Sequence, residues 1–166
     1  TARYFMFSQV YFHDIRVAYD EHLYRFLKKH LPDERYPDDP DAYLGWDDIK
    51  VIGLAREHSG DVDAKAILER EHFRRAYELT PQQLRTGPNV VDSMAEQLDA
   101  KFGSEAFVKD SSKQTRSLQP GQILVVDSDT GQTEDILERS TTLEAFQPIW
   151  FVRAYASREK RTDVLK

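Results

Sequence analysis

The longest patterned stretch of the chain, residues 2–31, contains neither proline nor glycine. We expect it to form one helix that ends before Pro32, because the residue before a proline disfavours the helical conformation. Up to about Ala18, apolar residues occur in nearly every direction around this helix, whereas beyond Ala18 they form a single stripe. A helix that is apolar on all sides has to be buried on all sides. We therefore expect a preceding domain of the same protein to cover the first half of this helix.

Two more helices are expected before residue 80. Residues 32–41 hold three prolines and five acidic residues, which indicates a loop. A helix over residues 44–57 would have Asp47 or Asp48 near its start, where the helix dipole favours negative charge. A third helix over residues 64–79 would be capped by Asp61 or Asp63. The residues expected to face inward are mostly apolar: Trp46, Ile49, Ile52 (or Gly53) and Leu54 in the second helix, and Ala66, Ile67, Phe73, Ala76 and Tyr77 in the third.

The pattern changes towards strands after Thr80-Pro81. Residues 90–102 form an amphipathic helix that Gly103 would close. Strands are expected at residues 106–109, 122–127 and 148–156, with residues 133–137 as a candidate partner across a turn and a short helix at 140–146. The charged tail 157–166 is expected to fray. The predicted fold is α+β: a helical region of about three helices (1–80), then a small antiparallel sheet with one or two helices (81–166).

Composition narrows the class of protein. The chain is 40% hydrophobic and 31% charged, as is typical of soluble globular proteins. It has no cysteine, so no thiol nucleophile or thiolate metal site is possible, and it has no apolar run long enough to span a bilayer. Lys plus Arg number 12 against 16 Asp plus Glu in residues 1–80, and 11 against 13 in residues 81–166, so nucleic acid is an unlikely partner. We expect a cytoplasmic protein with no membrane partner.

His13-Asp14 is an HD dipeptide, the type of pair that binds catalytic metals in some phosphohydrolases. Such a site needs several histidine and carboxylate ligands from separate helices, because together they hold the cations that activate water. None of the other four histidines precedes an aspartate, and there is no HExxH, GxSxG or phosphate-binding glycine loop. A hydrogen-bonded histidine in a packed helix is the favoured interpretation of His13. No catalytic residue, metal ligand or cofactor is therefore assigned within this chain.

Arg3 and Tyr11 are candidate binding residues. They are eight positions apart, a little over two helical turns, and would lie roughly on one face of a helix. The guanidinium of Arg3 suits phosphate oxygens, and the ring of Tyr11 suits a sugar. From the residues alone, a buried tyrosine and a frayed terminal arginine are the favoured alternative.

Three segments of the chain resemble a known family: ARYFMFSQVYFHD (2–14), YLGWDDIKVIGLA (43–55) and DAKAILEREHFRRAYEL (63–79). They resemble the region that follows the catalytic core in HD-superfamily dNTP triphosphohydrolases, which include bacterial dGTPase-like enzymes and the animal enzyme with a sterile alpha motif beside its HD domain. The resemblance covers nearly all of the chain in order, although the last ninety residues or so match only in pattern.

The resemblance implies a parent enzyme that hydrolyses a nucleoside triphosphate to nucleoside and triphosphate. Its divalent metal would be held upstream of Arg3, so this segment alone would be inert. Arg3 would contact the substrate's triphosphate, Tyr11 the deoxyribose, and Arg74 an activating nucleotide between subunits of a homo-oligomer. The resemblance also implies that the second half of the chain helps assembly.

Two positions depart from the family pattern. Asp14 stands where the family often has lysine, and Glu78 stands where the animal enzyme has a basic residue. A carboxylate at Glu78 would repel a phosphate, which argues against activation by a nucleotide. Two alternatives therefore stay open. One is a non-enzymatic interaction module or nucleotide-binding regulatory module, whose exposed apolar helix binds a partner. The other is a phosphohydrolase that acts on another phosphorylated ligand.

Overall fold

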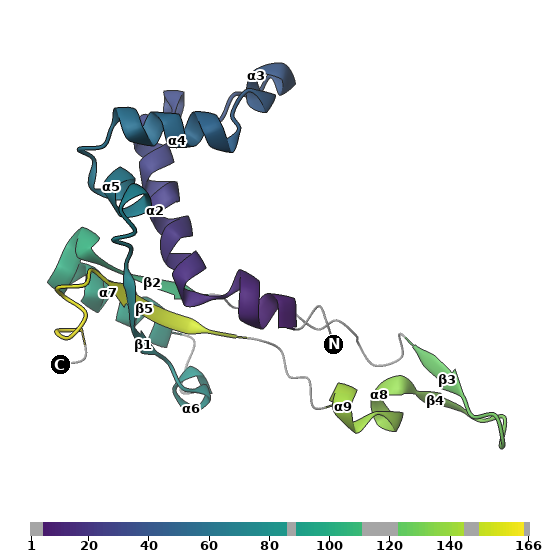
Figure 1. Ribbon diagram of the computed structural model, residues 1–166. Coiled ribbons are helices and arrows are strands. Elements are labelled where there is room, and N and C mark those ends of the chain that lie inside the picture. Colours follow the sequence, from purple (N-terminus) through teal and green to yellow (C-terminus); the bar gives the residue numbers. More distant parts are fainter. Residues whose placement is uncertain (1–4, 86–88, 111–122, 145–149, 165–166) are drawn as a thin grey trace.

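The computed structural model describes residues 5–85, 89–110, 123–144 and 150–164 (Figure 1). Within these residues the fold is α+β, as predicted. A helical part stands on one face of a three-stranded antiparallel sheet, and one further helix covers the opposite face. No helix in the described part of the chain is both long and apolar enough to cross a membrane.

The first stretch is not one continuous helix. It contains a π-helical turn, Phe7–Tyr11 (η1), followed by a break and then α2, Asp14–His30. In the π turn, the amide of Phe12 donates to the carbonyl of Phe7 at 2.9 Å. His13 is extended and its Nδ1 accepts from the amide of Ile15 at 3.3 Å, so it caps α2. The prediction of one unbroken helix over residues 2–31 is therefore wrong, although α2 ends before Pro32 as expected.

The second expected helix begins at Asp48 rather than at residue 44, and the end of the expected loop is a short helix. After a short 3₁₀ turn, Pro32–Glu34 (η2), come α3, Pro40–Leu44, and α4, Asp48–Glu57. Asp47 caps α4 by accepting from the amide of Lys50 at 2.8 Å. Ile49 was assigned to the apolar side of this helix but is 81% exposed. Leu54, on the same helix, does pack on the cluster that joins α2, α4 and α5.

The third expected helix is half helix and half strand. Helix α5, Val62–Leu68, begins at an Asp61 cap as predicted, but the chain then turns at Arg70, whose φ is +62°. It continues as β1, Arg74–Glu78. Phe73 is buried as expected, whereas Tyr77 lies on the exposed side of the strand. The prediction of a helix through residue 79 is wrong, because residues 74–78 pair as a strand with a segment far along the chain.

That partner is the central strand of the sheet, β5, Val152–Ala156, which lies between β1 and β2, Ala106–Asp110. All five residues of β5 are buried. Tyr155 packs with Val17 and Ala18 of α2 on one face, and Ala154 packs against α7, Val90–Phe102, on the other. Because β1 precedes residue 80 and the other two strands follow it, the sheet spans the expected domain boundary.

The remaining elements follow the predicted pattern in outline. Helix α7 ends at Gly103 as expected, after the short α6, Pro81–Arg85, and before a 3₁₀ turn, Gly103–Glu105 (η3). Strands β3, Leu124–Val126, and β4, Thr133–Asp135, pair across the predicted turn. Two short helices follow: α8, Ile136–Arg139, and α9, Thr141–Glu144. Figure 1 shows this hairpin unit apart from the three-stranded sheet.

The tail was expected to fray, but it is folded back onto the sheet as far as Val164. The amides of Lys160 and Arg161 both donate to the carbonyl of Ser157, which closes a turn directly after β5. Val164 then packs against the cluster between α7 and the sheet. This turn brings Arg161 beside β1.

Candidate functional site

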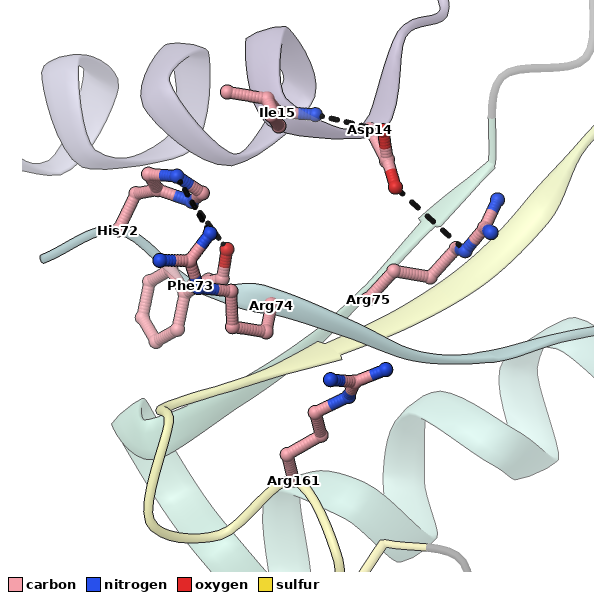
Figure 2. A pocket seen from close by; sticks show the side chains of 7 residues that line it. All are labelled: Asp14, Ile15, His72, Phe73, Arg74, Arg75 and Arg161. Carbon is pink, nitrogen blue, oxygen red and sulfur yellow. Dashed lines mark hydrogen bonds and ion pairs between the residues drawn. The ribbon is translucent and has the colours of Figure 1, made fainter. Parts of the chain in front are cut away.

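Three arginine side chains line one pocket at the junction of α2, β1 and the turn that follows β5 (Figure 2). The pocket has a volume of about 200 Å³. Strand β1 contributes Arg74 and Arg75, and the turn contributes Arg161. The polar residues that complete the lining are His72, just before β1, and Asp14, the first residue of α2. The pocket therefore carries more positive than negative charge.

The charge of Arg75 is compensated by carboxylates on both sides. Its Nε lies 3.8 Å from Oδ2 of Asp14, and its Nη1 donates to Oε2 of Glu78 at 3.0 Å. The same Glu78 oxygen accepts from Nε of the buried Arg153 at 2.7 Å. Arg75 and Arg153 thus share Glu78 in a network that links β1, β5 and α2.

No carboxylate in the described part of the chain pairs with the other two arginines, Arg74 and Arg161. Nη1 of Arg74 lies 3.1 Å from Nε2 of His72. A guanidinium group presents up to five N–H donors in a plane, which matches the oxygens of phosphate and similar anions. The arrangement is suited to binding a small anion.

A buried histidine, His22, holds the start of β1 in place beside the pocket. Nε2 of His22 accepts from the amide of Phe73 at 3.1 Å. Nδ1 of His22 must then carry the proton, which it donates to Oδ1 of Asp63 at 2.8 Å. The imidazole also stacks on the ring of Phe73, with centroids 4.2 Å apart. Through these contacts α2 and α5 fix the residue that precedes Arg74.

Tyr155 lies beneath the same junction, opposite Arg75 in the β1–β5 pairing. Burial raises the pKa of its hydroxyl, although the nearby Arg153 acts in the opposite direction. The phenol therefore stays protonated at neutral pH. Its ring stacks on that of Phe107, with centroids 4.9 Å apart, so Tyr155 forms part of the sheet face on which α2 packs.

Of the two predicted substrate-binding residues, the structure describes only Tyr11. Arg3 is outside the described residues. Tyr11 lies in η1, is 43% exposed and does not line the pocket. Its ring contacts Phe7, and the guanidinium of Arg16 lies 5.1 Å from its centre.

His13 caps α2 and lies 3.4 Å from Asp14, so it is not the helix-interior histidine that was favoured. Among the described residues, no group of three or more histidine, aspartate or glutamate side chains is arranged to hold a metal ion.

Of the three arginines that line the pocket, only Arg74 was singled out from the sequence. Arg75 and His72 lie beside it in the chain but were assigned to no site. Arg161 was assigned to a fraying tail. No local signal identifies these residues together, because the pairing of β1 with β5 is what brings residues 74 and 161 to one place.

Comparison with known proteins identifies a similar fold but no activity. No protein-family model and no curated protein matches the chain. The chain is similar to the 2.0 Å crystal structure of a hypothetical protein from Aquifex aeolicus, with a TM-score of 0.72 and 27% sequence identity. The match covers 99% of this chain and 42% of that chain. The present chain thus spans less than half the length of the protein whose fold it shares.

Proposed function

We propose that this chain is the C-terminal region of an HD-superfamily phosphohydrolase that acts on nucleoside triphosphates, deoxynucleotides in particular. In this proposal the chain contributes one wall of the substrate pocket and an assembly surface of a cytoplasmic homo-oligomer. The divalent metal is held by another part of the protein, and the segment is inert alone. The observation that carries the proposal is the arginine pocket. The third segment of the family resemblance, residues 63–79, includes His72, Phe73, Arg74 and Arg75 of its lining. Arg74, which the resemblance links to a nucleotide, is one of the two pocket arginines that form no ion pair with a carboxylate of the described residues.

The exposed apolar face around η1 also supports the proposal. Five large apolar side chains there are each 43–52% exposed: Phe5, Met6, Val10, Tyr11 and Ile15. Exposed apolar patches of this kind usually mark an interface. In an HD enzyme this face would pack against the metal-binding domain and would close the substrate pocket around Tyr11.

The arginine pocket has the properties of a phosphate site. Glu78 was expected to repel a phosphate, but its carboxylate is engaged by Arg75 and Arg153. A pocket of about 200 Å³ is smaller than the roughly 300–1,000 Å³ of sites that enclose a whole ligand. We therefore propose that it holds the phosphate groups of a nucleotide, in the regulatory role that the resemblance suggests for Arg74, and leaves the base outside.

The exposed apolar face is equally compatible with a second function. If that face binds a separate protein, the chain is a non-enzymatic interaction or nucleotide-binding regulatory module. This alternative predicts anion binding at the arginine pocket without hydrolysis in the intact protein.

Two measurements test the proposal. In the intact protein, Arg3→Ala and Tyr11→Phe should weaken metal-dependent hydrolysis, Arg3→Ala by about ten- to a hundredfold, because charge-assisted hydrogen bonds contribute roughly 1.5–3 kcal/mol. Unchanged kinetics in both variants would remove their assignment as substrate-binding residues.

The pocket is tested separately by calorimetric titration with inorganic tripolyphosphate. Arg74→Ala should weaken binding by about tenfold or more. Arg161→Ala should weaken it by a few-fold, because an exposed charge is screened by solvent. Arg158→Ala is the matched control, since Arg158 is exposed in the same turn but does not line the pocket. Equal affinities in all three variants would refute the pocket.

A further inference from the structure

Two consecutive arginines of β1 are held in different ways. Arg75 is held by the carboxylates of Asp14 and Glu78. Arg74 is held by a histidine, with its Nη1 3.1 Å from Nε2 of His72. The difference matters for anion binding, because a carboxylate compensates the charge of the arginine that it positions and a neutral group does not.

The hydrogen bonds of His72 determine its protonation. Its Nδ1 lies 2.7 Å from the carbonyl oxygen of Phe73, which can only accept, so Nδ1 carries a proton. The guanidinium of Arg74 can only donate, so Nε2 of His72 must present its lone pair. His72 is therefore a neutral imidazole that uses both ring nitrogens.

The ring of His72 is also fixed in place. The residue is 6% exposed, and its ring packs against that of Tyr19 in α2, with centroids 4.7 Å apart. The bond to its neighbour's carbonyl sets the ring orientation, and Tyr19 supports one side. Only one N–H of Arg74 is used by His72, which leaves the remaining donors of that guanidinium for the pocket. Figure 2 shows the His72–Arg74 contact at one side of the pocket.

We propose that His72 is the positioning residue of this pocket: it aims the guanidinium of Arg74 while leaving its positive charge uncompensated. Arg75, in contrast, ties α2 to the sheet, and its charge is already shared with two carboxylates. Arg74 is thereby the principal cation offered to a phosphate-bearing ligand. This inference rests on the proposed anion binding and names the residue that makes Arg74 competent for it.

Glutamine and glutamate variants separate position from charge. In His72→Gln, the oxygen of the side-chain amide can accept a hydrogen bond from Arg74 near the position of Nε2, and the side chain is neutral. In His72→Glu, the side chain has the shape of glutamine, but its negative charge neutralises Arg74. His72→Met removes the acceptor altogether. Inorganic tripolyphosphate is titrated calorimetrically into each variant of the intact protein, and each melting temperature is recorded.

The expected affinities follow from these properties. His72→Gln should bind tripolyphosphate with an affinity within about threefold of that of the unmodified protein. His72→Glu and His72→Met should each bind it at least about tenfold more weakly, which corresponds to about 1.4 kcal/mol. Equal affinities for the Gln and Glu variants, or full affinity for the Met variant, would overturn the proposal. Arg74→Ala tests the anion pocket separately from the role of His72. If this variant binds tripolyphosphate as tightly as the unmodified protein, the anion pocket itself is refuted.

A measurement on the unmodified protein covers the case in which the variants fail to fold. The nitrogen chemical shifts of ¹⁵N-labelled histidine report which ring nitrogen is protonated. The proposal expects a neutral His72 ring with its proton on Nδ1 at pH 7.5. A proton on Nε2, or a doubly protonated ring, would contradict it.

Discussion

The buried pair of His22 and Asp63 makes a strong prediction about stability. His22→Leu removes the imidazole that joins α2 to α5 and to the start of β1. It removes one hydrogen bond to a carboxylate, which is worth about 1.5–3 kcal/mol. It also leaves the buried amide of Phe73 without an acceptor, at a cost of about 1–3 kcal/mol. We expect a loss of about 3–5 kcal/mol, a large part of a typical domain stability of about 5–15 kcal/mol.

A double-mutant cycle isolates the contact between the two side chains. His22→Leu, Asp63→Leu and the double variant are unfolded in urea and followed by far-ultraviolet circular dichroism. Asp63 is uncompensated when His22 alone is replaced, so the double variant should be more stable than the sum of the single losses predicts, by about 1.5–3 kcal/mol. Losses that add within about 0.5 kcal/mol would show that the two side chains do not interact as described.

Two other predictions concern the ends of helices. Burial alone would raise the pKa of Asp61, but bonds from Lys29, from His30 and from the amides at the start of α5 hold it well below its usual range. Asp61→Asn keeps the helix cap but loses the negative charge, so the variant should melt several degrees below the unmodified protein at pH 7. This difference in melting temperature should shrink as the pH falls below about 4, because the carboxylate of the unmodified protein then becomes protonated. A difference that is independent of pH would contradict this. Gly103→Ala should lower the free energy of unfolding by about 1–2 kcal/mol in denaturation experiments, because φ is +51° at this position. The control Gly60→Ala should leave it nearly unchanged, because Gly60 has an ordinary φ and open space around it.

The elements that were predicted well carry their signals locally. Helix α7 has regular apolar spacing and a closing glycine, and its bounds agree with the prediction at both ends. Strand β5 carries a run of residues suited to burial on both faces, and the turn of the β3–β4 hairpin is marked by Asp, Ser, Thr and Gly. In these segments, intrinsic preference and tertiary environment favour the same conformation.

The elements that were missed depend on distant parts of the chain. Residues 74–78 have apolar positions compatible with a helix, and they are extended because β5 offers a hydrogen-bonding edge. Arg70 turns the chain with a positive φ although it is not glycine, so nothing in the local sequence marks the end of α5. The break at His13 likewise lacks a proline or glycine. The arginine pocket depends on all three features of the fold, so sequence reasoning identified Arg74 but not its neighbours.

The most direct test of the account is an assay of the intact protein against nucleoside triphosphates. The purified protein is incubated with each deoxynucleoside triphosphate and with Mg²⁺ or Mn²⁺, and phosphorus-31 spectra identify the products. The account predicts metal-dependent release of inorganic triphosphate together with the nucleoside. Absence of this reaction with every nucleotide and both metals, in a protein that still binds tripolyphosphate at the arginine pocket, would contradict the enzymatic claim and favour a regulatory binding module.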